Sequence, residues 1–382
     1  MGSDRPILGR RTWHGVACGP RVVLAPRNSL LIVGPTQVGK TSSLVIPAIL
    51  RWSDALVVTS VKSDVLAATR DWRSSIGEVQ VLEPGLDDGL TWDPLEGVRT
   101  LRHALRVARD LTIGSGDRGE TEFWNALATK LVAALMMMAL ECSRDIFAVA
   151  ALVERRDLRA WPDGGPRNEA SAIVESFLDY EAKTLDGVLT TAETMLVPWR
   201  FRQPLAKVLT VTTGANTLYL CSPRGEQRHY EALFRGALRM VLAEQQRLVD
   251  LGRQRRLLLL LDEAAAVASL DELDQLAATV SGLDVTLVTV VQDFAQLTAR
   301  WGARAPTIVN NHSTRLVLGG LTDPTVVNFL PELLESRSGA KAAPIRLRPI
   351  GTGSIVAGRR PVYSVRLQPW WRDRRLRPRG VR

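Results

Sequence analysis

Residues 30–47, LLIVGPTQVGKTSSLVIP, constrain the fold of this chain more than any other stretch. The apolar run before Gly34 predicts a buried strand, and SSLVIPAIL after the loop predicts a helix. Gly34 and Gly39 bracket a loop of the pattern GxxxxGKT. The backbone N–H groups of such a loop wrap phosphate groups at the positive N-terminal end of the helix. The stretch therefore predicts a phosphate-binding loop at the edge of an α/β sheet.

Two side chains of this loop predict what it does with the phosphates. Lys40 is expected to contact the β- and γ-phosphates of a nucleotide, as a catalytic as well as a binding group. The Thr41 hydroxyl is expected to be a ligand of Mg²⁺. The predicted nucleotide-binding residues are Gly34, Pro35, Thr36, Gln37, Val38, Gly39, Lys40, Thr41 and Ser42.

An acidic pair follows a run of five leucines in RRLLLLLDEAAAV. By itself, the pair could simply begin the next helix, since Asp is common at helix N-termini. Together with a phosphate-binding loop, Asp262 is expected to hold Mg²⁺, and Glu263 is expected to orient the attacking water. An acidic residue directly after the magnesium aspartate favours hydrolysis, so the pair predicts an ATPase that uses ATP and Mg²⁺.

Gln292 ends the apolar run of VTLVTVVQDFAQL. Its amide is a third candidate for the catalytic site, as a sensor of the γ-phosphate. The alternative is an ordinary polar residue at the end of a strand.

The rest of the chain predicts an α/β fold with a mostly parallel sheet flanked by helices. The expected strands are Ser29 to Val33, Ala55 to Ser60, Val79 to Leu82, Thr217 to Cys221, Leu257 to Leu261, Val285 to Val291 and Thr314 to Leu318. Between 101 and 207 the pattern is helical, which predicts an inserted all-α domain. Residues 1–100 and 208–345 would then form the two parts of the nucleotide-binding domain.

Charge is concentrated at the C-terminal end. Residues 346–382 hold eleven Arg and one Asp, while the whole chain carries a net charge of +9. This segment is expected to be a basic tail that contacts phosphate groups or anionic lipid, or a solvated end. Trp370 and Trp371 could instead pin it to its own domain. The chain shows no signal peptide, no apolar run of membrane-spanning length and three widely spaced cysteines, so we expect a cytoplasmic protein.

These motifs, in this order, resemble the type IV secretion coupling proteins of the VirD4/TraG/TraD family, within the FtsK/HerA-like motors. The matching segments are ILGR, GPTQVGKTSSLVIPAIL, VVTSVKSDV, TWDPL, EFWNALATKLVAALMMMAL, LLLLDEAA, VVQDFAQL and NNHSTRLVLGGLTDPTVVNFL. The last of these is similar to the actinobacterial type of the family. The resemblance covers most of residues 7–330.

The resemblance implies a RecA-like P-loop NTPase that forms a hexamer with ATP at the subunit interfaces, although an isolated chain could be a monomer. It also implies a central channel for DNA of any sequence, and a helical domain that receives a relaxase–DNA complex or a secreted effector. The other implied partners are the components of the type IV secretion channel. On this basis the chain is expected at the cytoplasmic face of the membrane.

The sequence departs from the family pattern in several places. Most members begin with membrane helices, so here a partner or a missing anchor would provide the attachment. The trans-acting Arg found before the glutamine motif is absent, which leaves Arg300, Arg304 and Arg315 as candidates. Asp93 replaces the commoner Asn, and Ser60 replaces the commoner Asp. An FtsK/HerA-like translocase and a protein-cargo adaptor remain as alternatives.

Overall fold

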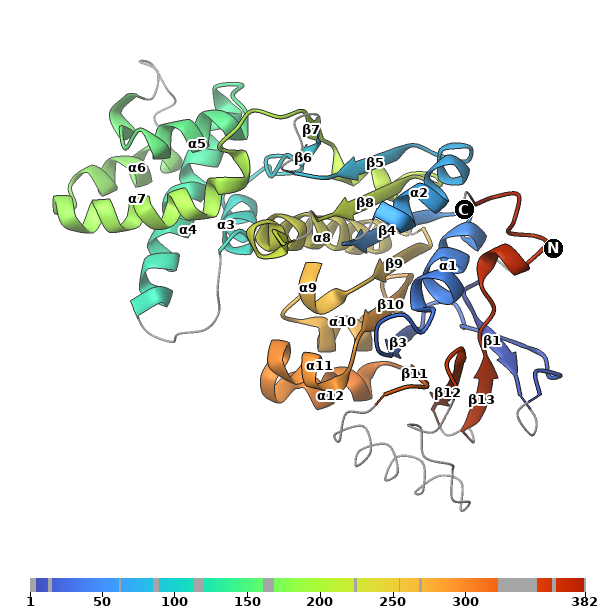
Figure 1. The fold of residues 1–382 in the computed structure, drawn as a ribbon. Helices are drawn as coiled ribbons and strands as arrows, with labels where there is room; N and C mark the ends of the chain where they lie inside the picture. Colours follow the sequence, from blue (N-terminus) through green and yellow to red (C-terminus); the bar gives the residue numbers. More distant parts are fainter. Residues whose placement is uncertain are drawn as a thin grey trace. The chain divides into compact units, whose positions relative to one another are not determined.

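The structure is a computed structural model, shown in Figure 1. It describes residues 5–12, 16–61, 63–84, 89–112, 120–160, 168–222, 225–253, 255–267, 270–321, 349–358 and 362–380. These residues form two compact units. The first comprises 1–80, 211–224 and 245–382, and the second comprises 81–210 and 225–244.

The first unit is built on an eleven-stranded sheet with the order β2-β1-β13-β12-β11-β3-β10-β9-β4-β8-β5. Its parallel strands are β3 (Ser29–Val33), β4 (Ala55–Ser60), β8 (Thr217–Cys221), β9 (Leu257–Leu261), β10 (Val285–Val291) and β11 (Thr314–Leu318). Every residue in these six strands is buried. A parallel sheet covered on both faces needs such continuous apolar runs. The predicted bounds of these strands, and those of β5 (Val79–Leu82), are confirmed, as is the fold class.

The antiparallel side of the sheet was not predicted. It consists of β1 (Ile7–Arg11), β2 (Arg21–Val23), β12 (Thr352–Ala357) and β13 (Tyr363–Arg366). Strand β12 pairs with β11, and β13 joins β12 to β1. The expectation that residues 346–382 form a basic tail is therefore wrong for these strands. They complete the sheet instead.

Short helices connect the strands of the first unit. They are α1 (Ile46–Arg51), α2 (Ser63–Ser74), α9 (Ala264–Val267), α10 (Leu273–Thr279), α11 (Phe294–Trp301) and α12 (Ala305–Asn311). Helix α1 packs on α2, and α10 packs on α12. The long helix α8 (Gln227–Asp250) leads into β9, and its residues before 245 belong to the second unit.

The second unit is mainly helical. It contains α3 (Leu101–Asp110), α4 (Glu120–Glu141), α5 (Ile146–Glu154), α6 (Glu169–Leu178), α7 (Ala182–Leu196) and a two-stranded sheet of β6 (Thr91–Trp92) with β7 (Leu205–Ala206). Helix α4 contacts α3, α5, α6 and α7, so it forms the centre of the unit. Among the described helices, only α4 has the length and hydropathy to cross a membrane, over Thr121–Glu141, and half of that stretch is buried in the protein.

Trp92 anchors the two-stranded sheet within the helical unit. Its ring is fully buried, and its carbonyl accepts a hydrogen bond of 2.7 Å from Trp199 Nε1. Gly236 of α8 lies against the same ring, where a Cβ atom would come within 2.5 Å of it. A side chain at position 236 would therefore displace the indole.

Glu96, in the turn after β6, gives the helical unit a pH dependence. Burial raises the pKa of this carboxyl group from 4.5 to about 7, although the backbone N–H groups of Leu209 and Val208 oppose the shift. The folded state therefore binds more protons than the unfolded state between these values, and its stability falls as the pH rises through them. Glu96→Gln should flatten this fall. Thermal unfolding at pH 5 and pH 8 measures it, and an equal loss in both proteins would contradict the prediction.

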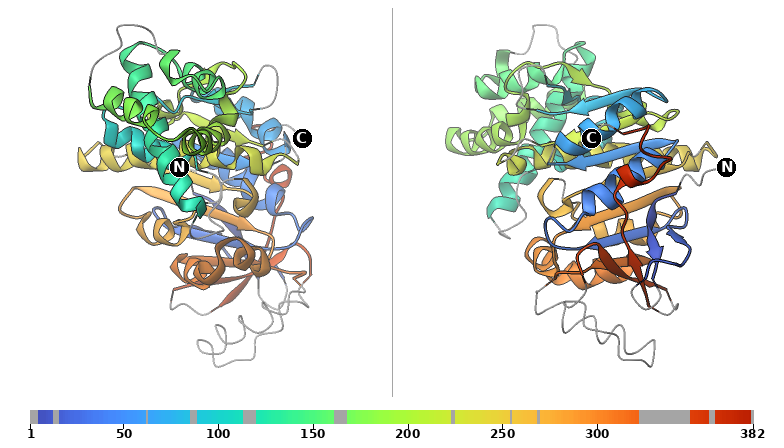
Figure 2. Two further views of the ribbon diagram at one scale, coloured as in Figure 1. Left: turned by 90° about the vertical axis from the view of Figure 1, so that its left-hand side faces the viewer. Right: turned by 45° about the vertical axis from the view of Figure 1, so that its right-hand side comes forward.

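The C-terminal segment after β13 packs against α1, as the right-hand view of Figure 2 shows. Trp370 and Leu376 are 3% and 2% exposed and join Ile46, Leu50 and Ala68 in one apolar cluster. The two tryptophans therefore pin the end of the chain to its own domain, which was one of the alternatives that the sequence left open. Its exposed arginines are Arg372, Arg374, Arg375 and Arg377.

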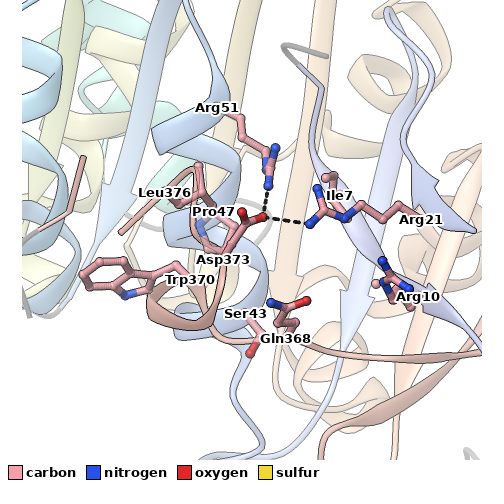
Figure 3. Close-up of a pocket in the computed structure, with 11 residues that line it drawn as sticks. Ile7, Arg10, Arg21, Ser43, Pro47, Arg51, Gln368, Trp370, Asp373 and Leu376 are labelled. Atoms are coloured by element: carbon pink, nitrogen blue, oxygen red, sulfur yellow. Dashed lines mark hydrogen bonds and ion pairs between the residues drawn. The ribbon is translucent and has the colours of Figure 1, made fainter. Parts of the chain in front are cut away.

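A buried ion pair holds the same segment. Asp373 pairs with Arg51 of α1 and, at 3.3 Å, with Arg21 of β2 (Figure 3). Both Asp373 and Arg51 are 8% exposed, and burial lowers the pKa of Arg51 while Asp373 opposes the shift. Asp373 therefore ties both ends of the chain to the helix that follows the phosphate loop.

Asp373→Asn should lower the free energy of unfolding of the first unit by about 3 kcal/mol, because it leaves the Arg51 charge buried without its carboxylate. Denaturant unfolding measures the change. Arg372→Gln, on the exposed neighbour, should change it by less than about 0.5 kcal/mol. Equal effects of the two substitutions would show that the ion pair does not stabilise the segment.

Candidate active site

The phosphate loop starts at the carboxyl end of β3, in the middle of the sheet. A Cβ atom on Gly34 would lie 2.9 Å from the side chain of Leu318 on β11, so this position requires glycine. Gly39 has a φ of +89° and Gln37 a φ of 64°. These left-handed conformations curl the loop, and glycine adopts them without steric cost. The sequence prediction of a tight, glycine-dependent loop is consistent with this geometry.

The Lys40 side chain contacts the residues that begin the loop. Its Nζ donates hydrogen bonds to the carbonyl oxygens of Gly34 and, at 2.7 Å, Pro35. The ammonium group is therefore held at the mouth of the loop by the residues that begin it. Because the side chain is only partly buried, it can reach a group bound there.

The helix after the loop begins with a widened turn. Residues Thr41–Val45 form a π-helical turn, in which the N–H of Ile46 donates to the carbonyl of Thr41. Pro47 has no N–H to continue the regular ladder, and its ring would crowd the carbonyl of Ser43. The wider turn, a feature often found at functional sites, places the Thr41 and Ser42 side chains at the loop.

The acidic pair lies at the carboxyl end of β9. Asp262 is 7% exposed, and its carbonyl accepts a 3.0 Å hydrogen bond from Thr59 Oγ1 on β4. Glu263 has a φ of 53°, which is uncommon for a residue other than glycine. Backbone strain of this kind is concentrated at functional sites. The turn begins at Asp262, directly after the last strand residue, Leu261.

The loop and the acidic pair line one cavity of about 420 Å³ in the first unit. Its lining residues are Thr36, Gln37, Gly39, Lys40, Thr41, Ser42, Ile46, Asp64, Ala68, Asp262, Glu263, Trp370 and Trp371. The structure thus brings together most of the site residues that the sequence predicted. Gly34, Pro35 and Val38 support the loop but do not line the cavity.

The residues present fit a nucleotide with Mg²⁺. The loop offers backbone N–H groups and an ammonium group, which suit phosphates, at a helix N-terminus. The Thr41 hydroxyl and the Asp262 carboxylate are the oxygen ligands that Mg²⁺ prefers. No group of three His, Cys, Asp or Glu side chains within the described ranges could hold a metal by itself. A magnesium ion here would therefore share its coordination with phosphate and water, as is usual for this metal.

Gln292 directly follows β10, the strand between β3 and β9. Val291 is in register with Val33, so Gln292 lies beside the start of the phosphate loop. Its backbone N–H donates to Gln296 Oε1 at 2.9 Å, and its side chain is not among those that line the cavity. A sensor role for Gln292 stays a prediction.

The candidate arginines differ in their surroundings. Arg304 pairs with Asp274 at 2.5 Å. Arg315 is 8% exposed and donates to the carbonyls of Asn310 and His312 at the end of α12. Both therefore have structural roles within the first unit, and Arg300 is exposed on α11.

Five lining residues were not predicted: Ile46, Asp64, Ala68, Trp370 and Trp371. Asp64 and Ala68 lie one turn apart on α2, and Trp371 comes from the other end of the chain. The only sequence signal for this lining was the pair of adjacent tryptophans, because such large apolar side chains are seldom left exposed to solvent.

Comparison with known proteins gives the family. A model described as type IV secretory system conjugative DNA transfer matches residues 13–188, and one described as the TraM recognition site of TraD and TraG matches 256–338. Together the two models match more than half of the chain. The chain belongs to the type IV secretion coupling proteins. The resemblance inferred from the motifs is confirmed.

Two curated members of the coupling protein family match the chain. Both are conjugal transfer proteins TraG of Escherichia coli, 23% and 22% identical over 313 residues. The alignments cover 71% of this chain and 49% of each relative. The chain thus spans about half the length of the curated relatives it matches.

Solved structures share the fold. The conjugative coupling protein TrwB in an unbound form has a TM-score of 0.69 at 19% identity, covering 95% of this chain and 94% of that one. TrwB with ADP and Mg²⁺ has a TM-score of 0.68, covering 90% and 85%. VirB4 of Thermoanaerobacter pseudethanolicus has a TM-score of 0.59 at 13% identity, covering 96% and 97%.

One departure from the coupling protein pattern has a structural explanation. Asp93 Oδ1 accepts a 3.0 Å hydrogen bond from the N–H of Leu95 in the turn after β6. The amide oxygen of Asn, the commoner residue, could accept the same bond without a charge. Burial raises the pKa of the Asp93 carboxyl group, which moves it toward the neutral form. The turn therefore accommodates either residue.

Proposed function

We propose that the chain is an ATP-hydrolysing coupling protein that recruits a relaxase–DNA complex and moves DNA into a type IV secretion channel. The observation that carries the proposal is the convergence of Lys40, Thr41, Asp262 and Glu263 on one cavity. The family supports the DNA-transfer role. TrwB structures with ADPNP and with ADP and Mg²⁺ support ATP and Mg²⁺ as the ligands.

Each residue has a chemical role in this proposal. The loop N–H groups and Lys40 bind the phosphates. When the phosphates bind, the hydrogen bonds from Lys40 Nζ to the carbonyls of Gly34 and Pro35 are replaced by hydrogen bonds to phosphate oxygens. Thr41 and Asp262 would hold Mg²⁺, which neutralises charge on the β- and γ-oxygens when it is bound. Glu263 orients and polarises the attacking water, and Gln292 is the candidate sensor of the γ-phosphate.

The assembly is part of the same proposal. The subunits would form a hexamer around DNA, attached at the cytoplasmic face of the membrane through partners or an anchor. The helical unit would receive the relaxase or a secreted effector. The C-terminal segment would contact the phosphate groups of DNA of any sequence through its exposed arginines, Arg372, Arg374, Arg375 and Arg377.

Two alternatives differ from this proposal in their cargo. An FtsK/HerA-like translocase would move chromosomal DNA, and a protein-cargo adaptor would use ATP as a conformational ligand. The large helical unit and the two family matches favour the coupling protein over the translocase. An intact acidic pair favours hydrolysis over a purely conformational use of ATP.

The decisive experiment measures ATP hydrolysis with and without single- and double-stranded DNA, with Lys40→Ala as the blank. We expect hydrolysis that DNA stimulates and that the variant lacks. The form of DNA that stimulates more would identify the translocated species. Hydrolysis that is indifferent to DNA would favour the protein-cargo adaptor, and its absence from the native chain under both conditions would contradict the motor.

A further inference from the structure

The cavity has an aromatic wall that the phosphate loop does not provide. Trp370 and Trp371 are the only aromatic residues among its described lining. They come from the C-terminal segment, more than 100 residues after the acidic pair. The remaining lining is mostly polar or charged and comes from the phosphate loop, the acidic pair, and Ile46, Asp64 and Ala68 of α1 and α2. The cavity thus has a phosphate-binding end and a separate aromatic surface.

The two indoles differ in what they can contact. Trp370 is 3% exposed and packs with Leu50 and Leu376 in the apolar cluster. Gly380 also covers its ring, because a Cβ atom there would come within 2.6 Å of the ring. Trp371 is only partly buried and meets Trp370 edge-on, at 5.9 Å between ring centroids and an angle of 81°. Trp371 is therefore the more exposed of the two indoles that line the cavity, and Trp370 packs against it.

Several contacts fix this wall in place. Asp373 pairs with Arg51 and Arg21 directly beside it, as Figure 3 shows. Arg379 donates a 2.9 Å hydrogen bond to the carbonyl of Leu50, and its guanidinium lies 4.0 Å from the centroid of the Trp72 ring. These contacts anchor the segment on α1 and α2, the two helices that follow the phosphate loop and β4. The indole surface is held by the domain itself.

We propose that Trp371 is the base-binding residue of the nucleotide site and stacks on the purine ring. This rests on the proposed function, because it assumes that the loop binds the phosphates of ATP. A flat, partly exposed indole beside a phosphate-binding loop suits a purine, since stacking uses the π-face that every base has. Stacking gives affinity with little selectivity among bases. We therefore expect ATP and GTP to bind with affinities within about threefold of each other.

This arrangement also links the C-terminal segment to the nucleotide. The base would contact a segment that is held on the sheet by β13 and the Asp373 ion pair. Bound nucleotide would therefore stabilise the docked segment, because a ligand stabilises the state that binds it.

The test compares ATP with tripolyphosphate, which has the phosphates but no base. Their dissociation constants are measured by calorimetry with Mg²⁺, for the native chain and for Trp371→Ala. We expect the variant to bind ATP about tenfold more weakly, and tripolyphosphate within about twofold of native. Trp371→Phe, which keeps an aromatic face, should retain most of the ATP affinity.

Phe201→Ala is the control, because Phe201 is an exposed aromatic residue of the helical unit and does not line the cavity. It should change neither dissociation constant by more than about twofold if the effect of Trp371 comes from the base. Thermal unfolding checks that the variants fold. Unchanged ATP binding by Trp371→Ala, or equal weakening of ATP and tripolyphosphate, would overturn the proposal. A native chain that binds neither ligand would instead contradict the proposed function, and the base site with it.

Discussion

Lys40→Ala should lower the rate of ATP hydrolysis by about 10³-fold and also weaken the binding of ATP. The ammonium group is the only side-chain cation among the described lining of the cavity, and it faces the loop carbonyls of Gly34 and Pro35. Without it, the γ-phosphate loses the donor that balances its charge in the transition state. Phosphate release measures the rate, and calorimetry measures the affinity.

Lys130→Ala provides the control for Lys40→Ala. It removes the same charge from α4 of the helical unit, where Lys130 Nζ lies 6.0 Å from the centroid of the Phe177 ring. Hydrolysis should stay at the native rate in this variant. A Lys40→Ala protein that folds normally and hydrolyses ATP as the native chain does would show that this loop is not the catalytic site.

Glu263→Gln should separate binding from chemistry. The substitution keeps the size of the side chain but removes its ability to polarise water, so kcat should fall by about 10³-fold. The affinity for ATP should stay within about twofold, because Lys40 and the loop are intact. Single-turnover hydrolysis and ATP binding by calorimetry test both halves of this prediction.

Glu272→Gln is the matched control for Glu263→Gln. Glu272 is an exposed carboxylate nine residues later, at the start of α10, and it does not line the cavity. Its substitution should leave kcat unchanged. If Glu263→Gln retained native turnover, the attacking water would have to be oriented by another group, and Gln292 would be the next residue to test. Together, Lys40→Ala and Glu263→Gln distinguish loss of the ligand from loss of hydrolysis.

The parallel core was predictable because its strands carry their own signal. Runs such as Leu257–Leu261 are buried on both faces of the sheet, so each must be apolar along its whole length. The phosphate loop was equally predictable from the sequence. Its backbone conformation requires a glycine at position 39, and the charge of the phosphates requires a cation such as Lys40. The expectation that these strands deliver Asp262 and Glu263 to the loop followed from parallel strands ending at the same edge of a sheet.

The antiparallel strands were missed for a physical reason. Strands β12 and β13 are short and lie in an arginine-rich region, and they become strands by pairing with β11 and β1. β12 and β13 are close in the sequence and pair with each other, but β1 lies at the other end of the chain, so no local pattern specifies how the two strands join the sheet. Strand propensity depends on such a context more than helix propensity does.

Arg73 is a second case that only the tertiary structure decided. It is fully buried at the end of α2 and donates to the carbonyls of Trp52, Asp54 and Ala215 and to Thr217 Oγ1. Burial lowers the pKa of this guanidinium to about 10. On a helix that is polar along most of its length, nothing in the sequence distinguishes Arg73 from an exposed arginine.

By itself, the sequence determined the parallel sheet, the phosphate loop, the acidic pair and the family, because each depends on residues that are close together in the chain. The tertiary structure alone decided that the arginine-rich C-terminal end joins the sheet and that Trp371 lines the cavity of the phosphate loop. Both features rest on contacts between residues far apart in the chain, such as the ion pair between Asp373 and Arg51, which are more than 300 residues apart. Such a contact becomes favourable only when the rest of the domain has folded and excluded water from it.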